Sequence, residues 1–448
     1  MLLSPVVVLA GLLCPPAAQG EERAVPEAEA PVVDARRPPI IEAIDVVGND
    51  KTEREVIMQR VSVQSGDPVD DNRIEASRLR LLALGYFKSV ELSLRRGSRR
   101  GLVVLVIEVI ERNTIVIDGL YLGRSSVTPF FGGIGVHESN LLGKGVGAGA
   151  GFVLGEGRRA VEASLFIPDL SGTPLQLSAS GIYVDAAEVL VVSDPDALQL
   201  RYSRVGASLG LGLGVGLAQR VSLSYRLESI SVAPLPNLDP ASLRAAPSIL
   251  FDSSVLSTLS LTYELDTRDD AFVPTRGTRV GLAVETGTRL IGSSYEFTKY
   301  TGEVQLAFQP IRGHSLTLQV AGGLIQGQTP FFNQFFLRDY QYFTVGRDTL
   351  PRALQTNMSR SNDYDDLIAS AGVEYNLPIQ SGDGFLFRTY LYGGVNVAAT
   401  ASLDEVQEDL SGRGTGRKLP LSADLGLRMD TLIGNFTVSI AYLLDQGI

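Results

Sequence analysis

The 448-residue chain contains no tryptophan, one cysteine (Cys14) and two histidines (His137 and His314). A single cysteine excludes an intramolecular disulfide, and the isolated histidines form no Cys/His pattern with metal-ligand spacing. The glycine strings at 145–151 and 206–216 lack the Lys-Ser/Thr step of a phosphate loop, and no Gly-x-Ser-x-Gly elbow precedes a predicted helix. The sequence therefore predicts no metal, no cofactor and no catalytic residues, and we expect the chain not to be an enzyme.

Long apolar runs are also missing. Beyond the first 20 residues, no stretch reaches the ~18 consecutive apolar residues that a membrane-spanning helix needs. Yet 44% of the residues are hydrophobic, which is high for a chain of net charge −11. The acidic balance argues against nucleic-acid binding. Because an open sheet would leave unpaired amides in lipid, a membrane location would require a closed barrel.

The first 20 residues are apolar and end in a small-residue Ala-x-Gly step, which predicts a secretory signal peptide. A transmembrane helix is disfavoured there because Pro5, Pro15 and Pro16 interrupt the run. Residues 21–39 are rich in Glu, Ala, Arg and Pro and are predicted to be a flexible linker. The mature chain would then contain no cysteine, which suits an oxidising envelope compartment.

Apolar and polar residues alternate on both sides of a charged turn in residues 256–285. Period-two alternation around Pro274 and Gly277 predicts a β-hairpin with one apolar and one polar face. The pattern recurs after about residue 130, in runs of the ~9–11 residues that a tilted strand needs to cross a bilayer. About fourteen such strands can be recognised. The apolar positions of the clearest strands are Leu209, Leu211, Leu213, Val215, Leu316, Leu318, Val320, Leu425, Leu427, Val438 and Ile440.

This alternation predicts a mainly β fold: a transmembrane antiparallel barrel over residues 127–448. A hinge is expected at Val116 to Ser126, just before it. Two long polar insertions, Ala233 to Phe251 and Gln328 to Tyr364, are predicted to be extracellular loops, and the short turns at the other end periplasmic.

Residues 40–112 have a different pattern, which predicts a compact α/β domain of order β-α-α-β-β. Thr52-x-x-Glu55 matches a capping box that would open a short helix through Val61. Asp70 or Asp71 can cap a second helix, which Gly85 would end.

This segment resembles a POTRA domain, the periplasmic module of outer-membrane assembly and transport barrels; any other small α/β domain is the alternative. The resemblance covers the whole segment. It rests on Ile44, Val46, Gly48, Asn49, Thr52, Gly66, Asp67, the run Leu79 to Gly85 with Tyr86 and Phe87, and Val109-x-Glu111.

The hairpin described above resembles the strand-turn-strand signature of the bacterial surface antigen barrel, shared by BamA-type and TamA-type assembly factors. Phe297-Thr298-Lys299-Tyr300 fits the same family. The resemblance implies a barrel of about sixteen strands. A charged turn with no active role is the alternative for the individual signature residues, which are Asp266, Thr267, Arg268, Asp269, Pro274 and Gly277.

The resemblance also implies an arginine on a long loop that folds back into the lumen. Arg352 is the first candidate and Arg338 the second. A carboxylate partner is needed because an unpaired charge out of water is costly, and Glu374 matches the family's acidic position. The next acidic position of the family is Gly393 here, which weakens the expected lock. A solvated loop arginine is the alternative for Arg352.

In this family the first and last strands pair weakly and form a lateral seam. The glycine-rich strand containing Gly132, Gly133 and Gly135 would be the first, and Gly434 to Leu443 the last. Ordinary barrel closure is the alternative that the sequence leaves open.

By resemblance, the function is insertion or translocation of other proteins at the outer membrane of a Gram-negative-type cell, or at an organelle outer envelope, with the POTRA domain in the periplasm. The implied partners are the lipid bilayer and unfolded outer-membrane or secreted clients; accessory lipoproteins are a further class that the resemblance allows. No nucleic acid or cofactor is implied. A substrate-specific secretion pore and a purely structural surface barrel are the alternatives.

Overall fold

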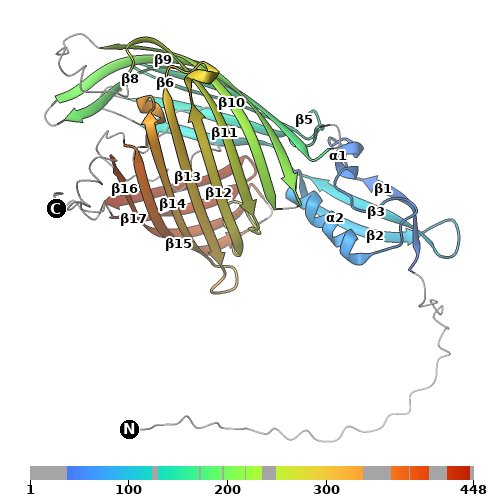
Figure 1. The fold of residues 1–448 in the computed structure, drawn as a ribbon. Coiled ribbons are helices and arrows are strands. Elements are labelled where there is room, and N and C mark those ends of the chain that lie inside the picture. The colour runs from blue at the N-terminus through green and yellow to red at the C-terminus, as the bar shows by residue number, and fades with distance from the viewer. Residues whose placement is uncertain are drawn as a thin grey trace, which may run out of the picture.

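The computed structural model describes residues 38–123, 130–170, 173–193, 196–216, 218–234, 249–335, 365–382, 384–402 and 421–443. A small α/β domain lies at one end of a large, tilted sheet that curls into a barrel (Figure 1). The predicted signal peptide, and the predicted linker up to residue 37, lie outside the described residues.

The α/β domain has the predicted order of elements. They are β1 (Ile40–Val47), α1 (Arg54–Met58), α2 (Asp71–Ala83), β2 (Phe87–Arg96) and β3 (Leu102–Glu111). β3 is the central strand, with β1 parallel to it on one side and β2 antiparallel on the other. The buried side chains of the helices and the sheet form one core, which includes Ile41, Ile57, Leu81, Phe87, Leu105 and Ile107.

The two helices begin differently. Asp70 caps α2, because its carboxylate accepts hydrogen bonds from the backbone amides of Asn72 and Arg73. The predicted capping box at Thr52 is wrong: the N-cap of α1 is Glu53, which makes no side-chain cap bond, and the helix ends at Met58, before Val61. The Thr52 hydroxyl instead accepts a hydrogen bond from Asn140 of the barrel at 2.9 Å. The local sequence pattern could not show this contact between the domain and the barrel.

The barrel is one antiparallel sheet of fifteen strands in chain order among the described residues. Each strand pairs antiparallel with its neighbours in sequence, whether a short turn or a long loop joins them. The strands are β4 (Ile115–Gly123), β5 (Phe131–Leu141), β6 (Val146–Gly155), β7 (Arg158–Ile167), β8 (Leu175–Ser193), β9 (Asp196–Val215), β10 (Gln219–Pro234), β11 (Asp252–Asp266), β12 (Gly277–Gly287), β13 (Glu296–Phe308), β14 (Ser315–Gln328), β15 (Leu367–Ser381), β16 (Leu386–Ala401), β17 (Leu421–Thr431) and β18 (Gly434–Leu443).

The predicted hinge at Val116 to Ser126 is wrong, because β4 occupies most of it and is the first barrel strand. The ladder between β4 and β5 contains a register shift between Ile117 and Gly119. Such a bulge breaks the period-two pattern on which the prediction depended. The glycine-rich strand Phe131–Leu141 is therefore the second strand, and β4 is the one that faces β18.

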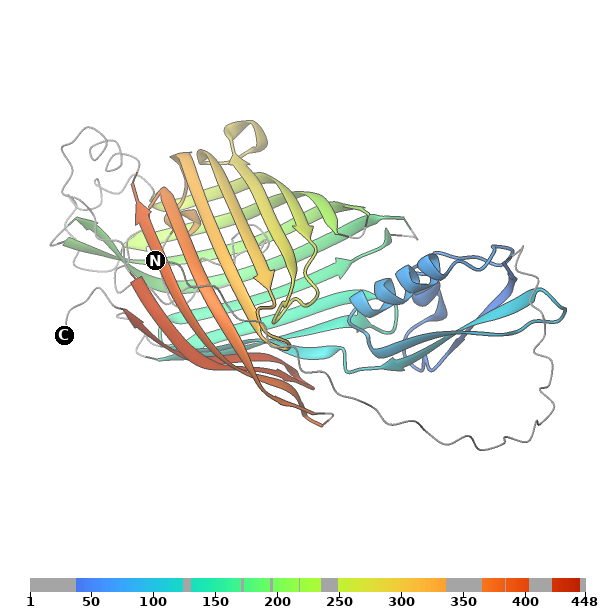
Figure 2. The same cartoon turned by 90° about the horizontal axis from the view of Figure 1, so that it is seen from below.

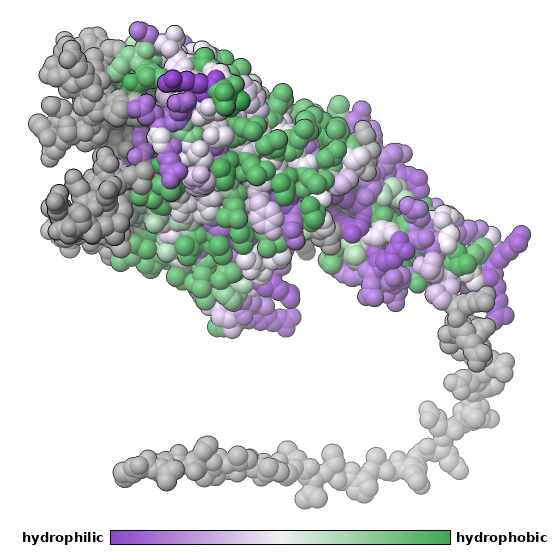
Figure 3. All heavy atoms as spheres, in the orientation of Figure 1, coloured by the Kyte–Doolittle hydropathy of each residue, from purple (hydrophilic) through white to green (hydrophobic). Residues whose placement is uncertain are grey.

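The alternation predicted from sequence separates two faces. Leu209, Leu211 and Leu213 are 62%, 55% and 43% exposed, whereas inward-facing neighbours such as Arg204 and Glu228 are buried. Leu223 and Leu261 lie beside Leu211 in register and are exposed too. Apolar side chains cover the flank of the barrel, while polar ones gather on the α/β domain (Figure 3). This is the outside that a lipid bilayer requires.

Turns at one end of the barrel, the domain-side rim, lie beside the α/β domain (Figure 2). The predicted long loops both connect strand ends at the opposite, far rim. The start of the second loop is a 3₁₀ turn, η3 (Phe331–Asn333); another, η2 (Arg289–Ile291), follows β12. Among the described residues, no helix has the length and apolarity to cross a membrane.

We expect Leu223→Arg to lower the free energy of unfolding in lipid vesicles by about 2–4 kcal/mol, because it places a charge on the lipid face of β10. Urea unfolding followed by far-UV circular dichroism measures it. Ser224→Arg, one residue along and facing the polar lumen, is the matched control. Equal losses for the two variants would contradict the assignment of the faces.

Candidate functional site

The barrel sheet is not closed by a ladder among the described residues. Pairing runs without a break from β4 to β18, but no strand pairing joins β18 to β4. We call this junction the seam. At the seam, one edge of β4 and one edge of β18 have no ladder partner among the described residues.

Among the described residues, the hydrogen bonds across the seam lie at its domain-side end, at the turn between β17 and β18. The amide of Ile117 donates to the carbonyl of Ile433 at 2.7 Å. The side-chain amide of Asn113 donates to the carbonyl of Leu432 at 3.0 Å. Gly434 follows with φ +142°, and a Cβ there would lie 2.5 Å from the carbonyl oxygen of Ile117. Glycine is therefore required where β18 begins.

The α/β domain docks on the turn between β5 and β6. The Glu53 amide donates to the carbonyl of Gly143 at 2.9 Å, and the Tyr86 hydroxyl donates to the carbonyl of Gly145 at 3.3 Å. Burial in this contact raises the pKa of Tyr86. Arg60 of the domain also forms an ion pair with Asp169 of the barrel. These contacts fix the domain beside the first barrel strands, next to the seam.

The other predicted POTRA motif residues build the domain itself. Gly48, Gly66 and Gly85 all have positive φ values, of 87°, 95° and 73°. The Asn49 side chain donates to the Thr52 carbonyl, and the Asp67 carboxylate accepts from the Gln64 amide, each at 3.0 Å. Phe87 lies in the core of the domain, with its ring centre 6.2 Å from that of Tyr86.

The predicted hairpin signature forms the turn between β11 and β12, which we call the signature turn (residues 267–276). The Asp269 carboxylate accepts hydrogen bonds from the amides of Thr275 and Arg276 at 2.8 and 3.1 Å. Thr267 exchanges hydrogen bonds with the backbone of Thr278 across the turn. Gly277 follows the turn with φ +104°. A Cβ at this position would lie 2.4 Å from the Thr267 carbonyl oxygen, so glycine is required there.

The remaining signature residues tie the turn to the rim. Arg268 pairs with Asp266 at 2.6 Å and also donates to Gln305 of β13 at 2.7 Å. The carbonyl of Pro274 accepts a hydrogen bond from the hydroxyl of Ser315 on β14 at 2.5 Å. The signature is thus a folded, hydrogen-bonded structure whose contacts extend beyond its own hairpin.

Glu374, the predicted carboxylate partner, lies on β15 and binds Arg428 of β17. The Arg428 Nη2 donates to its Oε2 at 2.8 Å, and Nη1 donates to the Asn376 Oδ1 at 3.2 Å. The guanidinium carbon lies 4.4 Å from the ring centre of Tyr392. Sequence reasoning missed Arg428, although it occupies an inward position of an alternating strand two strands away. The predicted loop arginines, Arg352 and Arg338, lie outside the described residues, and Gly393 lies on β16 between these two strands.

A second cluster of charges lines the wall near the far rim. Arg204 pairs with Glu228 through two hydrogen bonds of 2.8 and 3.0 Å, and both side chains are buried. Arg226 pairs with Glu285 of β12. Charged residues of opposite sign occur at lumen-facing positions of these strands. This pattern is the sequence signal from which the cluster could have been predicted.

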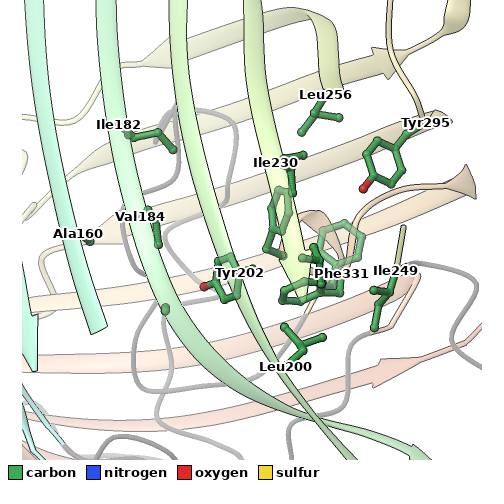
Figure 4. Close-up of a cluster of buried hydrophobic side chains, with 14 of the residues drawn as sticks. Ala160, Ile182, Val184, Leu200, Tyr202, Ile230, Ile249, Leu256, Tyr295 and Phe331 are labelled. Carbon is green, nitrogen blue, oxygen red and sulfur yellow. The ribbon is translucent and has the colours of Figure 1, made fainter. Parts of the chain in front are cut away.

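The long loop after β14 begins by folding against this cluster. Asn333 of η3 accepts a hydrogen bond from Arg226 at 3.1 Å through its side chain and one from Lys299 at 2.6 Å through its backbone. Phe331 packs among side chains of several barrel strands, including Tyr202 and Ile230 (Figure 4). The first residues of the loop therefore fill part of the barrel interior.

No group of three or more potential metal-ligating side chains occurs among the residues that the structure covers.

Comparison with known proteins follows the two parts of the structure. The family model for the Omp85 superfamily domain matches residues 140–447, and the POTRA model, described as the surface antigen variable number repeat, matches residues 39–112. The outer membrane protein assembly factor BamA of Nitratidesulfovibrio vulgaris is 24% identical over 426 residues, which cover 93% of this chain and 50% of that protein. BamA of Neisseria meningitidis is 25% identical over 333 residues, which cover 68% of this chain and 40% of that protein. The chain thus spans about half the length of the curated relatives it matches, or less.

Solved structures give the same fold. BamA from Haemophilus ducreyi lacking POTRA domains 1–3 aligns with a TM-score of 0.56 at 16% identity, covering 92% of this chain and 82% of that one. CdiB from Escherichia coli aligns with a TM-score of 0.60 at 11% identity, covering 91% of this chain and 74% of that one.

We expect Arg428→Met to lower the free energy of unfolding by about 3 kcal/mol, because it leaves Glu374 largely buried without its cation. The double variant Arg428→Met/Glu374→Gln should recover part of that loss. Circular dichroism during urea unfolding in detergent measures both. A double variant no more stable than the single one would show that the pair is not the origin of the effect.

Proposed function

Because the chain belongs to the Omp85 superfamily and lies in the outer membrane with its POTRA domain in the periplasm, we propose that it assists the insertion or translocation of other proteins at that membrane. The single observation that supports this proposal most strongly is the seam between β4 and β18. A membrane barrel without such a role gains stability by pairing every strand edge.

The seam provides a template for client strands. The unpaired edges of β4 and β18 present amide and carbonyl groups in the spacing of a β-ladder, so a client strand can add to either by hydrogen bonding. Val438 and Ile440 project from β18 and are 63% and 80% exposed. An apolar, lipid-facing strand with a free edge matches the strands that a nascent barrel must form.

The POTRA domain supplies a second edge. Its sheet ends in β1 and β2, and the backbone of residues 66–69 hydrogen-bonds to residues 39–41 at the start of β1. Among the described segments, none forms a ladder with the outer edge of β2. Client segments in the periplasm would add to β2 and then reach the seam, beside which the domain docks.

In this proposal the partners are unfolded outer-membrane or secreted proteins and the lipid bilayer, with accessory lipoproteins as a further class. The protein acts without a reaction of its own, so it is not an enzyme and needs no cofactor. A substrate-specific secretion pore would instead need the packed side chains around Phe331 to move aside.

Locking the seam tests the proposal. We expect the pair Ile117→Cys/Ile433→Cys, whose backbones are hydrogen-bonded at 2.7 Å, to form a disulfide that abolishes assembly of other outer-membrane barrels. Reductant should restore assembly. The mature chain is expected to lack other cysteines, so the bond forms only where it is placed.

Leu427→Cys/Val438→Cys is the matched control, because these residues already face each other in the β17–β18 ladder. Its disulfide should leave assembly unchanged. Normal assembly with the seam locked would contradict the proposal. Ion conductance in planar bilayers, with client barrels unaffected by depletion of the protein, would favour the secretion pore.

A further inference from the structure

The signature turn reaches well beyond the two strands it connects. It contacts Gln305 at the end of β13 and Ser315 at the start of β14. At the start of β16, the Nη1 of Arg388 donates to the Oδ2 of Asp270 at 2.7 Å. The neighbouring Val273 is buried, with 1% of its surface exposed. The turn therefore lies along the domain-side rim, past the ends of several strands.

Arg388 joins this turn to the penultimate strand. Its Nε and Nη2 donate to the Oδ2 of Asp430 at 3.0 and 2.6 Å. Arg388 and Asp430 are directly opposite each other in the β16–β17 ladder. One guanidinium thus bridges a carboxylate of the turn and a carboxylate of β17, a geometry that the planar fork of arginine permits.

Asp430 stands immediately before the residues that hold the seam. Thr431 follows it and donates its hydroxyl to the carbonyl of Gly434 at 2.7 Å. The carbonyls of Leu432 and Ile433, between them, are the acceptors of the two seam bonds. A continuous set of contacts therefore runs from the signature turn through Arg388 and Asp430 to the closed end of the seam.

We propose that Arg388 is a positioning residue: its bridge from Asp270 to Asp430 holds the β17–β18 turn against β4 and sets how readily the seam opens. The inference rests on the proposed function for its biological meaning. It gives the signature turn a role at a seam that lies several strands away.

The Arg388 bridge connects distant parts of the domain-side rim, which distinguishes it from ordinary ion pairs there. We call its contact with Asp270 the cross-rim link. Asp270 is on the β11–β12 turn, whereas Asp430 is on β17, so the pair of contacts connects parts of the barrel that share no ladder. Arg279 of β12 also bridges two carboxylates, pairing with Glu264 at 3.0 Å and Glu303 at 2.6 Å. Those partners are on the adjacent strands β11 and β13, so Arg279 reinforces existing ladders only.

Hydrogen exchange at the seam tests the proposal without any client protein. In the full-length protein in lipid nanodiscs, Arg388→Gln should raise exchange rates roughly tenfold in peptides covering residues 113–117 and 431–435. Arg279→Gln is the matched control and should leave those peptides unchanged. Heat-modifiable migration on gels confirms that each variant is a folded barrel.

Asp270→Asn separates the cross-rim link from the local pair. The asparagine keeps the Oδ1 acceptor that binds the amides of Phe272 and Val273, and Arg388 keeps Asp430. We expect this variant to raise seam exchange as Arg388→Gln does. Unchanged exchange in Asp270→Asn, or an equal rise in Arg279→Gln, would overturn the proposal.

The outcomes remain distinguishable from those of the proposed function. If the seam lock has no effect on assembly while Arg388→Gln loosens the seam, the coupling stands and the function fails. If the lock abolishes assembly and the exchange rates do not respond, the function stands and the coupling fails.

Discussion

A strand in a bilayer must pair its backbone groups, because lipid offers no hydrogen-bond partner. Among the described residues of this barrel, fourteen consecutive ladders meet that demand, and no ladder joins β4 to β18. In the described part of the chain, this junction is held by a backbone hydrogen bond, an asparagine side chain and a glycine that allows close approach. The other features of the structure hold this open junction together, shield it or use it.

The charged residues of the interior strengthen the remainder of the wall. Arg204, Arg226 and Arg428 each bind a carboxylate of a different strand, and little of any of the three is exposed. Such pairs are costly to break once formed, because the surviving charge would be stranded away from water. These pairs therefore reinforce the paired part of the wall, on β9, β10 and β12 and on β15 and β17.

Sequence patterning predicted the fold well where one local rule decided it. Period-two alternation located the strands around Leu209, Leu318 and Leu425, and Asp70 was one of the two residues predicted to cap α2. It failed where a distant contact or an irregularity decided the outcome: Thr52 bonds to Asn140 in place of capping α1, and the bulge beside Gly119 disguised β4 as a hinge. The family resemblance located the signature turn. Neither the alternation pattern nor the resemblance could show that the turn contacts Arg388, because this contact depends on how the sheet curls. Arg428 as the partner of Glu374 required knowing which inward positions meet across two strands.

Distance measurements across the seam test the central claim most directly. Nitroxide pairs would be placed across the seam near the domain-side end (Ile117 of β4 and Ile433 of the β17–β18 turn) and near the far rim (Leu122 of β4 and Ala441 of β18), in the protein reconstituted in lipid. The account predicts a short, narrow distribution at the first pair and a longer, broader one at the second. Short, narrow distributions at both pairs, as for strands about 4.8 Å apart in a complete ladder, would contradict it.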